Sequence, residues 1–215
     1  MPPRHSNNPV RSDTLRRTAR RALLALLVAC PVTAALQGCA PLVVGGVAVG
    51  AATIHDRRPY YVVIDDQDIE LSAMGVINAD PGLKKGSRIA VTSYNRKVLL
   101  TGQADTARLV ARAGELVSRL QKVELVLNEI QVGPRISLAQ EGEDTLITSR
   151  ALIALTKIDL PGFDPTRVKV VTEDDVVYLM GLVSPAEADA ATEKVRYVPG
   201  VKRVVRLFEL KEIRT

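Results

Sequence analysis

Two stretches of the chain repeat the same alternation of apolar and polar positions. Residues 88–102 align without gaps with residues 167–181, a constant separation of 79 residues, and the runs end in Val-Leu-Leu-Thr-Gly and Val-Tyr-Leu-Met-Gly. Apolar residues recur at every second position in both, which is typical of half-buried strands. Repetition at a fixed spacing predicts two copies of one structural unit.

The residues around these strands complete the unit. Asn95-Arg96-Lys97 and Asp174-Asp175 predict tight hairpin turns, and Gly102 and Gly181 are expected to end the second strand of each hairpin. The helices that follow show clear patterns. Six apolar residues share one face of 106–120: Leu109, Val110, Ala113, Leu116, Val117 and Leu120.

Helix starts are marked by capping residues. Ser184, followed by Pro185 and by Glu187 three positions on, predicts an N-cap for the last helix, and Asp66 or Asp68 is expected to cap the first one. We therefore predict an α+β fold of two tandem domains. Each is a three-stranded mixed sheet with two helices on one face, in the order αββαβ, at 65–135 and 142–213 with a linker at 136–141.

The N-terminal region has the pattern of a signal peptide. A basic segment at 11–21 precedes an apolar run of 15 residues at 22–36, too short to cross a bilayer comfortably. The next residues, Leu-Gln-Gly-Cys at 36–39, resemble the lipobox of bacterial lipoproteins. That resemblance implies a signal peptide at 1–38, acyl chains on Cys39 and a tether at 39–64. It also implies lipid anchoring to the periplasmic face of the outer membrane.

Two other interpretations of this region stay open. One is an ordinary signal peptide in which Cys39 has no special role. The other is a single membrane helix over 22–54, which Pro31 and Pro41 disfavour because proline interrupts helices.

Composition removes several classes of function. The net charge of +5 arises entirely within residues 1–38, and the rest of the chain carries equal numbers of acidic and basic residues, so no nucleic-acid partner is expected. With two His, two Cys and no Trp, neither a zinc site nor a disulfide framework nor a base-stacking surface is expected. We predict no catalytic residues, no metal, and no cofactor apart from the acyl chains on Cys39.

Three motifs resemble BON domains: Val-Leu-Leu-Thr-Gly at 98–102, Leu-Asn-Glu-Ile at 127–130 and Pro-Gly-Val-Lys-Arg-Val at 199–204. Together with the lipobox, they make the chain similar to the DolP family of outer-membrane lipoproteins, which carry two BON domains. The resemblance implies a periplasmic protein that binds anionic phospholipid through its second domain and supports outer-membrane integrity. It also implies links to cell division and to outer-membrane protein assembly.

The first helix of the second domain, expected at 145–158, has two apolar faces. One is the core stripe, formed by Ile147, Ala151, Ala154, Leu155 and Ile158. The opposite face carries Leu146, Ser149, Arg150, Ile153 and Lys157. An apolar pair between two cations suits the surface of an anionic bilayer, and we expect phosphatidylglycerol or cardiolipin as the ligand.

Alternatives to this lipid face remain. Leu146 and Ile153 could pack against the other domain or be scattered surface residues, and the family carries Trp where this chain has Leu146. A second candidate surface is the cationic cluster Lys202, Arg203, Arg206, Lys211 and Arg214, which also fits a solvated strand edge. The alternative function is a scaffold for outer-membrane assembly machinery or cell-division factors.

Overall fold

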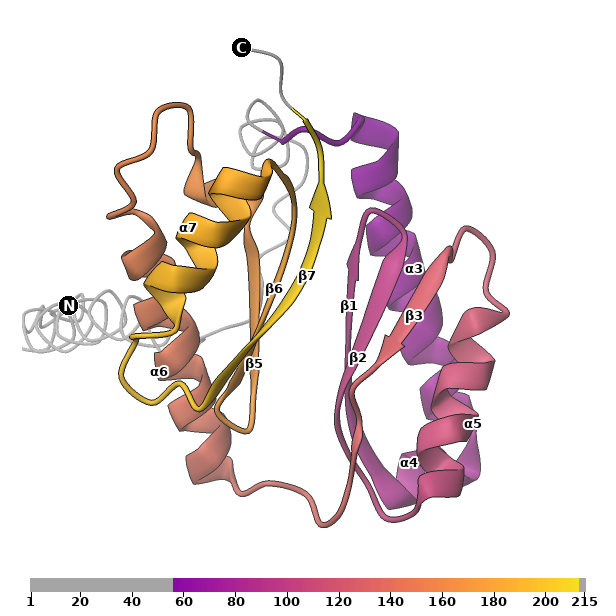
Figure 1. Cartoon of the computed structure of the whole chain (residues 1–215). Helices are drawn as coiled ribbons and strands as arrows, with labels where there is room; N and C mark the ends of the chain where they lie inside the picture. The colour runs from indigo at the N-terminus through magenta and orange to yellow at the C-terminus, as the bar shows by residue number, and fades with distance from the viewer. Residues whose placement is uncertain (1–55, 213–215) are drawn as a thin grey trace, which may run out of the picture. The chain divides into compact units, whose positions relative to one another are not determined.

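Residues 56–212 are described by the structure, a computed structural model, and they form two successive α+β domains (Figure 1). The elements of the first domain are α3 (Tyr60–Ala79), α4 (Pro81–Gly86), β1 (Ser87–Tyr94), β2 (Lys97–Ala104), α5 (Ala107–Ser118), β3 (Leu125–Asn128) and β4 (Gln131–Val132). Those of the second are α6 (Leu138–Leu155), η1 (Pro165–Arg167), β5 (Lys169–Glu173), β6 (Val176–Val183), α7 (Pro185–Val195) and β7 (Arg203–Leu210).

Both sheets are mixed, with the second strand of each hairpin at the centre. In the first domain β2 pairs antiparallel with β1 and parallel with β3, and in the second β6 pairs antiparallel with β5 and parallel with β7. The predicted α+β class and the αββαβ order are confirmed. The first domain has the helix α4 before β1, where the second has the short η1 before β5. The short strand β4 pairs with the end of β2, and in the second domain the last residues of β7 make the same pairing with the end of β6 in one uninterrupted strand.

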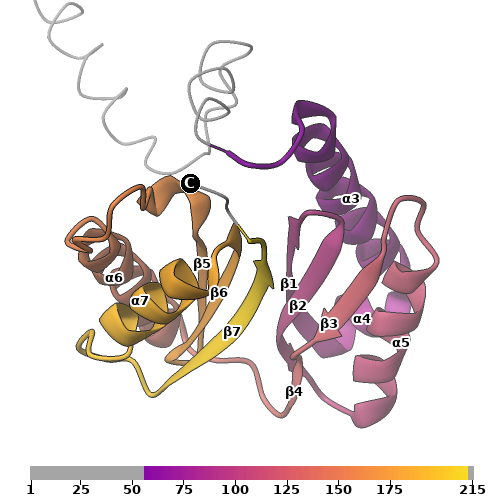
Figure 2. The same ribbon diagram turned by 45° about the horizontal axis from the view of Figure 1, so that its top comes forward.

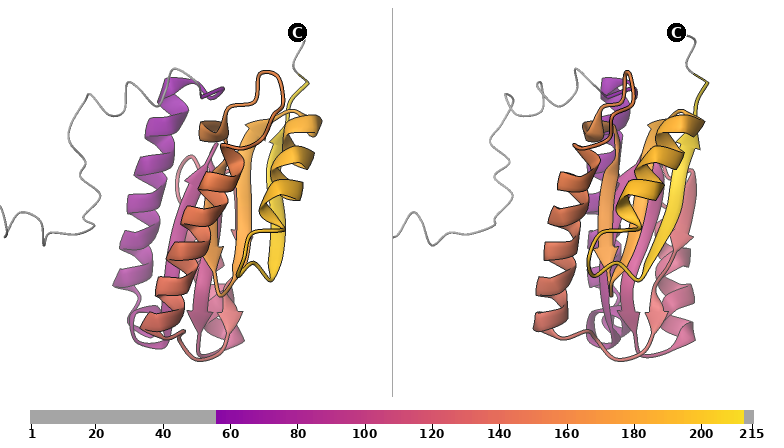
Figure 3. Two further views of the ribbon diagram at one scale, coloured as in Figure 1. Left: turned by 90° about the vertical axis from the view of Figure 1, so that its left-hand side faces the viewer. Right: turned by 60° about the vertical axis from the view of Figure 1, so that its left-hand side comes forward.

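The helices of each domain cover one face of its sheet (Figure 2; Figure 3). The first core is centred on Ile69, Leu83, Val98, Leu100 and Val117. The second is centred on Ile147, Leu155, Val177, Leu179 and Val195. The residues of both core clusters lie between positions 69 and 208.

In each sheet, the face opposite the helices is also covered. Side chains from both sheets form a third apolar cluster around Tyr94, Leu99, Tyr178 and Met180. The Tyr94 hydroxyl accepts a hydrogen bond of 3.2 Å from the backbone N–H of Leu182. Because both faces of each sheet are buried, the outer sides of the helices offer exposed surface for contact with other molecules.

Gly102 and Gly181 lie inside their strands, so the expectation that they end them is wrong. Each glycine lets another backbone segment approach its strand closely. A Cβ atom on Gly102 would lie 2.0 Å from the carbonyl oxygen of Arg88, and one on Gly181 would lie 2.6 Å from that of Arg167. A neighbouring segment thus excludes any larger residue from the same place in each domain.

The predicted cap of the first helix is also wrong. Helix α3 begins after Pro59, without a side-chain cap, and Asp66 is buried in its middle. Its carboxylate accepts hydrogen bonds from the backbone N–H groups of Asn95, at 2.8 Å, and Arg96, at 2.7 Å. Asp66 therefore joins the helix to the β1–β2 turn.

The bounds of helix α6 differ from the predicted range of 145–158. It begins at Leu138 after the N-cap Ser137, whose hydroxyl accepts a hydrogen bond from the Gln140 N–H, and it ends at Leu155. Leu138 is exposed, so the first turns show no apolar period that marks a helix. Similarly, α3 extends back to Tyr60, into the segment expected as a tether, and its exposed first residues hide the start.

Candidate functional site

The outer face of α6 carries four of the five residues predicted to contact lipid, Leu146, Ser149, Arg150 and Ile153, and Lys157 follows just after the helix ends. Ile147, Ala151 and Leu155 turn fully inward to the second core. On the opposite side, Leu146 is 50% exposed and Ile153 is 57% exposed. The first domain covers neither residue, so the outer face presents an apolar pair to the surroundings.

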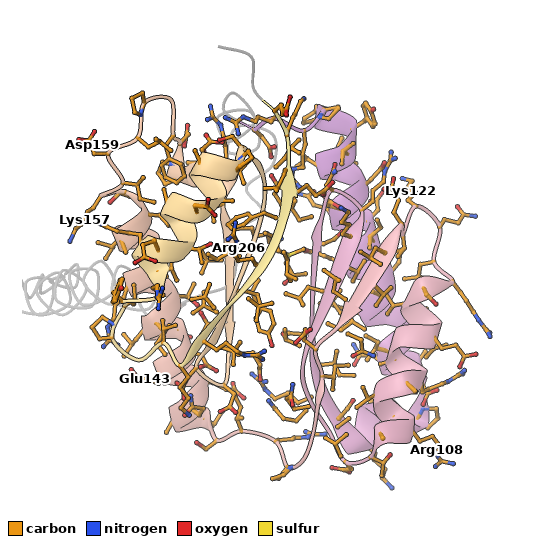
Figure 4. The ribbon with its side chains drawn as sticks, viewed as in Figure 1. Arg108, Lys122, Glu143, Lys157, Asp159 and Arg206 are labelled. Carbon is orange, nitrogen blue, oxygen red and sulfur yellow. The ribbon has the colours of Figure 1, made fainter. Side chains whose placement is uncertain are left out.

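Two cations flank this pair. Arg150 Nη1 donates to Glu143 Oε1 at 3.0 Å and to the carbonyl oxygen of Pro199 at 3.3 Å. Lys157 has no acidic partner within residues 56–212, and it projects outward from the far end of α6 (Figure 4). Ser149 is exposed on the same face, with its hydroxyl donating to the Thr145 carbonyl within the helix at 2.9 Å.

The acidic residues near the start of α6 are engaged in the protein. Asp144 is buried and faces the β5–β6 turn. Glu141 pairs with Arg88 at 2.8 Å, and Glu143 pairs with Arg150. Because each of these carboxylates has a donor within the protein, its repulsion of an anionic surface is reduced.

A groove of about 510 Å³ runs beside the outer face. On the α6 side it is lined by Arg150, Ile153, Ala154 and Lys157. On the other side it is lined by the end of α7 and the segment that follows, namely Lys194, Tyr197, Val198 and Pro199. An exposed aromatic and a further cation thus join the residues predicted from the helix pattern.

Lys194 and Tyr197 were missed by the sequence reasoning. Tyr197 is 71% exposed, and the Cζ atom of Arg196 lies 5.2 Å from its ring centroid. The signal available in the sequence was a tyrosine among charged residues, in a chain with only 3% aromatic residues. Nothing local indicated that this residue lies opposite α6, because that proximity arises only when α7 packs beside α6.

The second candidate surface, the C-terminal cationic cluster, is partly neutralised. Lys202 pairs with Asp175 at 2.8 Å, and this hydrogen bond lowers the pKa of the Asp175 carboxyl below its ordinary value. Arg206 pairs with Asp189 at 2.8 Å. Arg203 begins the edge strand β7, Lys211 directly follows its last residue, and Arg214 lies outside the described residues. The groove beside α6 therefore has the stronger claim to an anionic ligand.

Within residues 56–212, no group of His, Cys, Asp or Glu side chains is arranged to hold a metal ion. Asp65, in the acidic run on α3, pairs with Lys122 and Arg96, whose hydrogen bonds lower its pKa. No helix in the same part of the chain combines the length and apolar character that a bilayer span requires. Cys39, the predicted acylation site, lies outside this part of the chain.

Comparison with known proteins identifies the repeated unit. The family model of the BON domain matches residues 65–134 and 144–212. The chain is 34% identical over 175 residues to the outer membrane lipoprotein DolP of Haemophilus influenzae, a match that covers 81% of this chain and 89% of that protein. It is 37% identical over 156 residues to a 21 kDa hemolysin of Actinobacillus pleuropneumoniae, covering 71% and 78% of the two chains.

These matches agree with the repeat, the two mixed sheets and the lipobox-like sequence before Cys39. They span both domains rather than one of them. The chain belongs to the BON-domain family and is a dual-BON, lipid-anchored outer-membrane lipoprotein of the DolP type.

Proposed function

We propose that this lipoprotein binds anionic phospholipids through its second BON domain and thereby supports the integrity of the outer membrane. The observation that carries the proposal is the outer face of α6, where exposed Leu146 and Ile153 lie among Arg150 and Lys157. An interfacial helix uses this combination, because apolar side chains enter the headgroup region while cations meet the phosphates.

The expected affinity of this face alone is modest. Each basic residue near an anionic surface contributes about 1 kcal/mol, and the apolar pair adds a few kcal/mol in total. A domain that is already tethered to the membrane needs no tighter binding, because the tether raises its effective concentration at the bilayer. We propose that the acyl chains on Cys39 supply this tether.

Vesicle binding tests the proposal. Protein beginning at Ala40 should co-sediment with vesicles of phosphatidylglycerol or cardiolipin but not with vesicles of phosphatidylcholine. Leu146→Asp and Ile153→Asp should abolish this binding. Leu71→Asp, at an exposed leucine of the first domain, is the matched control and should bind normally. Unchanged binding by both α6 variants would remove the assignment.

The proposed acyl anchor has its own test. Cys39→Ala in the full-length chain removes the sulfur that would carry lipid. We expect the variant to leave the outer-membrane fraction, because one helix face binds too weakly to hold the protein there. Mass spectrometry of the mature protein should find acyl chains at Cys39. An unmodified thiol at that position would contradict the proposal.

A second candidate function, a scaffold for outer-membrane assembly or cell-division proteins, is favoured by the outer side of α3. Tyr60, Ile64, Leu71 and Met74 are exposed along this helix. They share one face at helical spacing, and Gln67, which lies between Ile64 and Leu71 on that face, is uncharged. An uncharged apolar face suits a protein surface better than anionic lipid.

A photo-crosslinker at Leu71 in cells should then capture one of these proteins, identified by mass spectrometry, while a crosslinker at the exposed Arg108 should not. Labelling of lipid or of nothing at Leu71 would argue against the scaffold.

A further inference from the structure

The groove beside α6 carries more positive charge than the helix alone. Lys157 stands at the end of α6, and Lys194 lies in the last turn of α7 on the opposite wall. Neither lysine has an acidic partner in the chain from Asp56 to Glu212, whereas Arg150 is shared with Glu143. Two unpaired ammonium groups thus face one groove.

The floor and rim of the groove differ in polarity. Ala154, Val198 and Pro199 provide apolar lining between the two walls. At the rim, Tyr197 exposes most of its ring beside the half-exposed Ile153. A tyrosine has an apolar ring and a polar hydroxyl, which suits the level of the lipid headgroups. The groove therefore combines charge for a phosphate with apolar contact for the glycerol region.

We infer that this groove binds the phosphodiester headgroup of a single anionic glycerophospholipid, with Lys157 and Lys194 on its two walls and Tyr197 at the bilayer interface. This inference rests on the proposed function and makes it more specific. The outer face of α6 alone would hold a bilayer by general attraction, whereas a groove with two walls selects an individual headgroup.

The inference also assigns different roles to Leu146 and Tyr197. Leucine lacks the polar group that anchors an aromatic side chain at the bilayer interface. Tyr197 supplies an exposed aromatic from the segment after α7, on the other side of Ile153. The aromatic side chain of this surface therefore stands on the wall of the groove opposite α6.

A fluorescent probe can be placed in the groove because the chain contains no tryptophan. Tyr197→Trp, in protein beginning at Ala40, gives a single reporter at the rim, and Tyr60→Trp gives a matched reporter on the first domain. Phosphatidylglycerol vesicles should shift the emission of the first variant to shorter wavelength and leave that of the second unchanged. Phosphatidylcholine vesicles should shift neither.

Two soluble ligands separate the sources of phosphate. Glycerophosphoglycerol, the free headgroup, should compete with the vesicles, and inorganic phosphate at the same concentration should not. Competition by both would assign the groove to phosphate in general and overturn the headgroup assignment.

The lysines are tested by Lys157→Gln and Lys194→Gln, each expected to weaken vesicle binding about fivefold, the equivalent of about 1 kcal/mol per basic residue. Lys84→Gln is the matched control, because Lys84 is an exposed lysine in the last turn of α4. If Lys194→Gln lowers stability but not binding, its role is to offset the dipole of α7 and the inference fails.

The two proposals fail in different ways. Suppose that Ile153→Asp abolishes vesicle binding, but vesicles do not change the emission of the Tyr197→Trp variant. The α6 face would then be retained and the groove overturned. Absence of any vesicle binding by the unmodified sequence would overturn both.

Discussion

The carboxylate of Asp144 accepts a hydrogen bond of 2.9 Å from the backbone N–H of Asp175, and a second of 2.9 Å from that of Asp174. These turn residues have φ values of 63° and 49°, a conformation that few residues adopt readily. Asp66 holds Asn95 and Arg96 in the same way in the first domain. Each domain thus fixes its hairpin with one buried carboxylate from its first helix.

Asp144→Ala should destabilise the second domain by about 1–3 kcal/mol, because it leaves two N–H groups of a strained turn without their acceptor. Urea denaturation measures the change in the free energy of unfolding. Asp68→Ala is the control, since Asp68 is exposed on α3 and should have little effect. Equal stability of the two variants would show that the turn keeps its conformation without the Asp144 carboxylate.

Gly102→Ala should be more damaging. The added Cβ would lie 2.0 Å from the Arg88 carbonyl oxygen, and the φ of +116° disfavours any side chain. Strands β1 and β2 must separate to relieve the contact, so we expect a loss of several kcal/mol, roughly the range seen for severe core substitutions. Thermal denaturation tests this, with Gly75→Ala as the control because a Cβ there meets nothing within 4 Å.

Glu187 makes stability depend on pH. Burial raises the pKa of the Glu187 carboxyl, whereas hydrogen bonds from Arg57 and from the Ser184 backbone lower it. The lowering is the larger effect, so the pKa lies below its ordinary value of 4.5. A lowered carboxyl pKa stabilises the folded state at neutral pH, and this stabilisation is lost as the pH falls below about 4.5.

The corresponding test is denaturation at a series of pH values. Glu187→Gln should be less stable than the unmodified sequence at pH 7 and should lose less stability between pH 5 and pH 3. Parallel pH curves for the two proteins would contradict this role. Asp65, Asp80 and Asp175 also have lowered pKa values and contribute to both curves alike, so the difference between the curves isolates Glu187.

Local patterns predicted much of this fold. The strands were recognisable because Ile89 and Val91, and then Val98 and Leu100, recur at period two and face the helices. The burial of the opposite face, where Leu99 packs, was not predicted. The start of α7 was equally clear. Ser184 and Glu187 form the reciprocal pair of hydrogen bonds that the sequence indicated. The opposed faces of α6 followed from helical geometry alone, even though the predicted ends of that helix were wrong.

Features that depend on contacts distant in the sequence could not be predicted. Nothing around Asp66 indicates that its carboxylate reaches a turn 29 residues later. Gly102 resembles a strand end until the Arg88 carbonyl is placed against it. Tyr197 joins Ile153 at one groove only through the packing of α7 beside α6. In each case the local sequence allows several roles, and the tertiary structure selects one.

Leu146→Trp should strengthen binding to anionic vesicles, if the outer face of α6 lies on the bilayer. The larger side chain adds roughly 40 Å² of apolar contact, worth about 1 kcal/mol at about 25 cal/mol per Å², or about fivefold in affinity. It also introduces the only tryptophan, so emission and co-sedimentation can be followed on one sample. Because Leu146 is half exposed, the substitution should not disturb the core. Tighter binding with emission shifted to shorter wavelength would place α6 in the headgroup region, whereas unchanged affinity and unshifted emission would place the bilayer contact elsewhere on the domain.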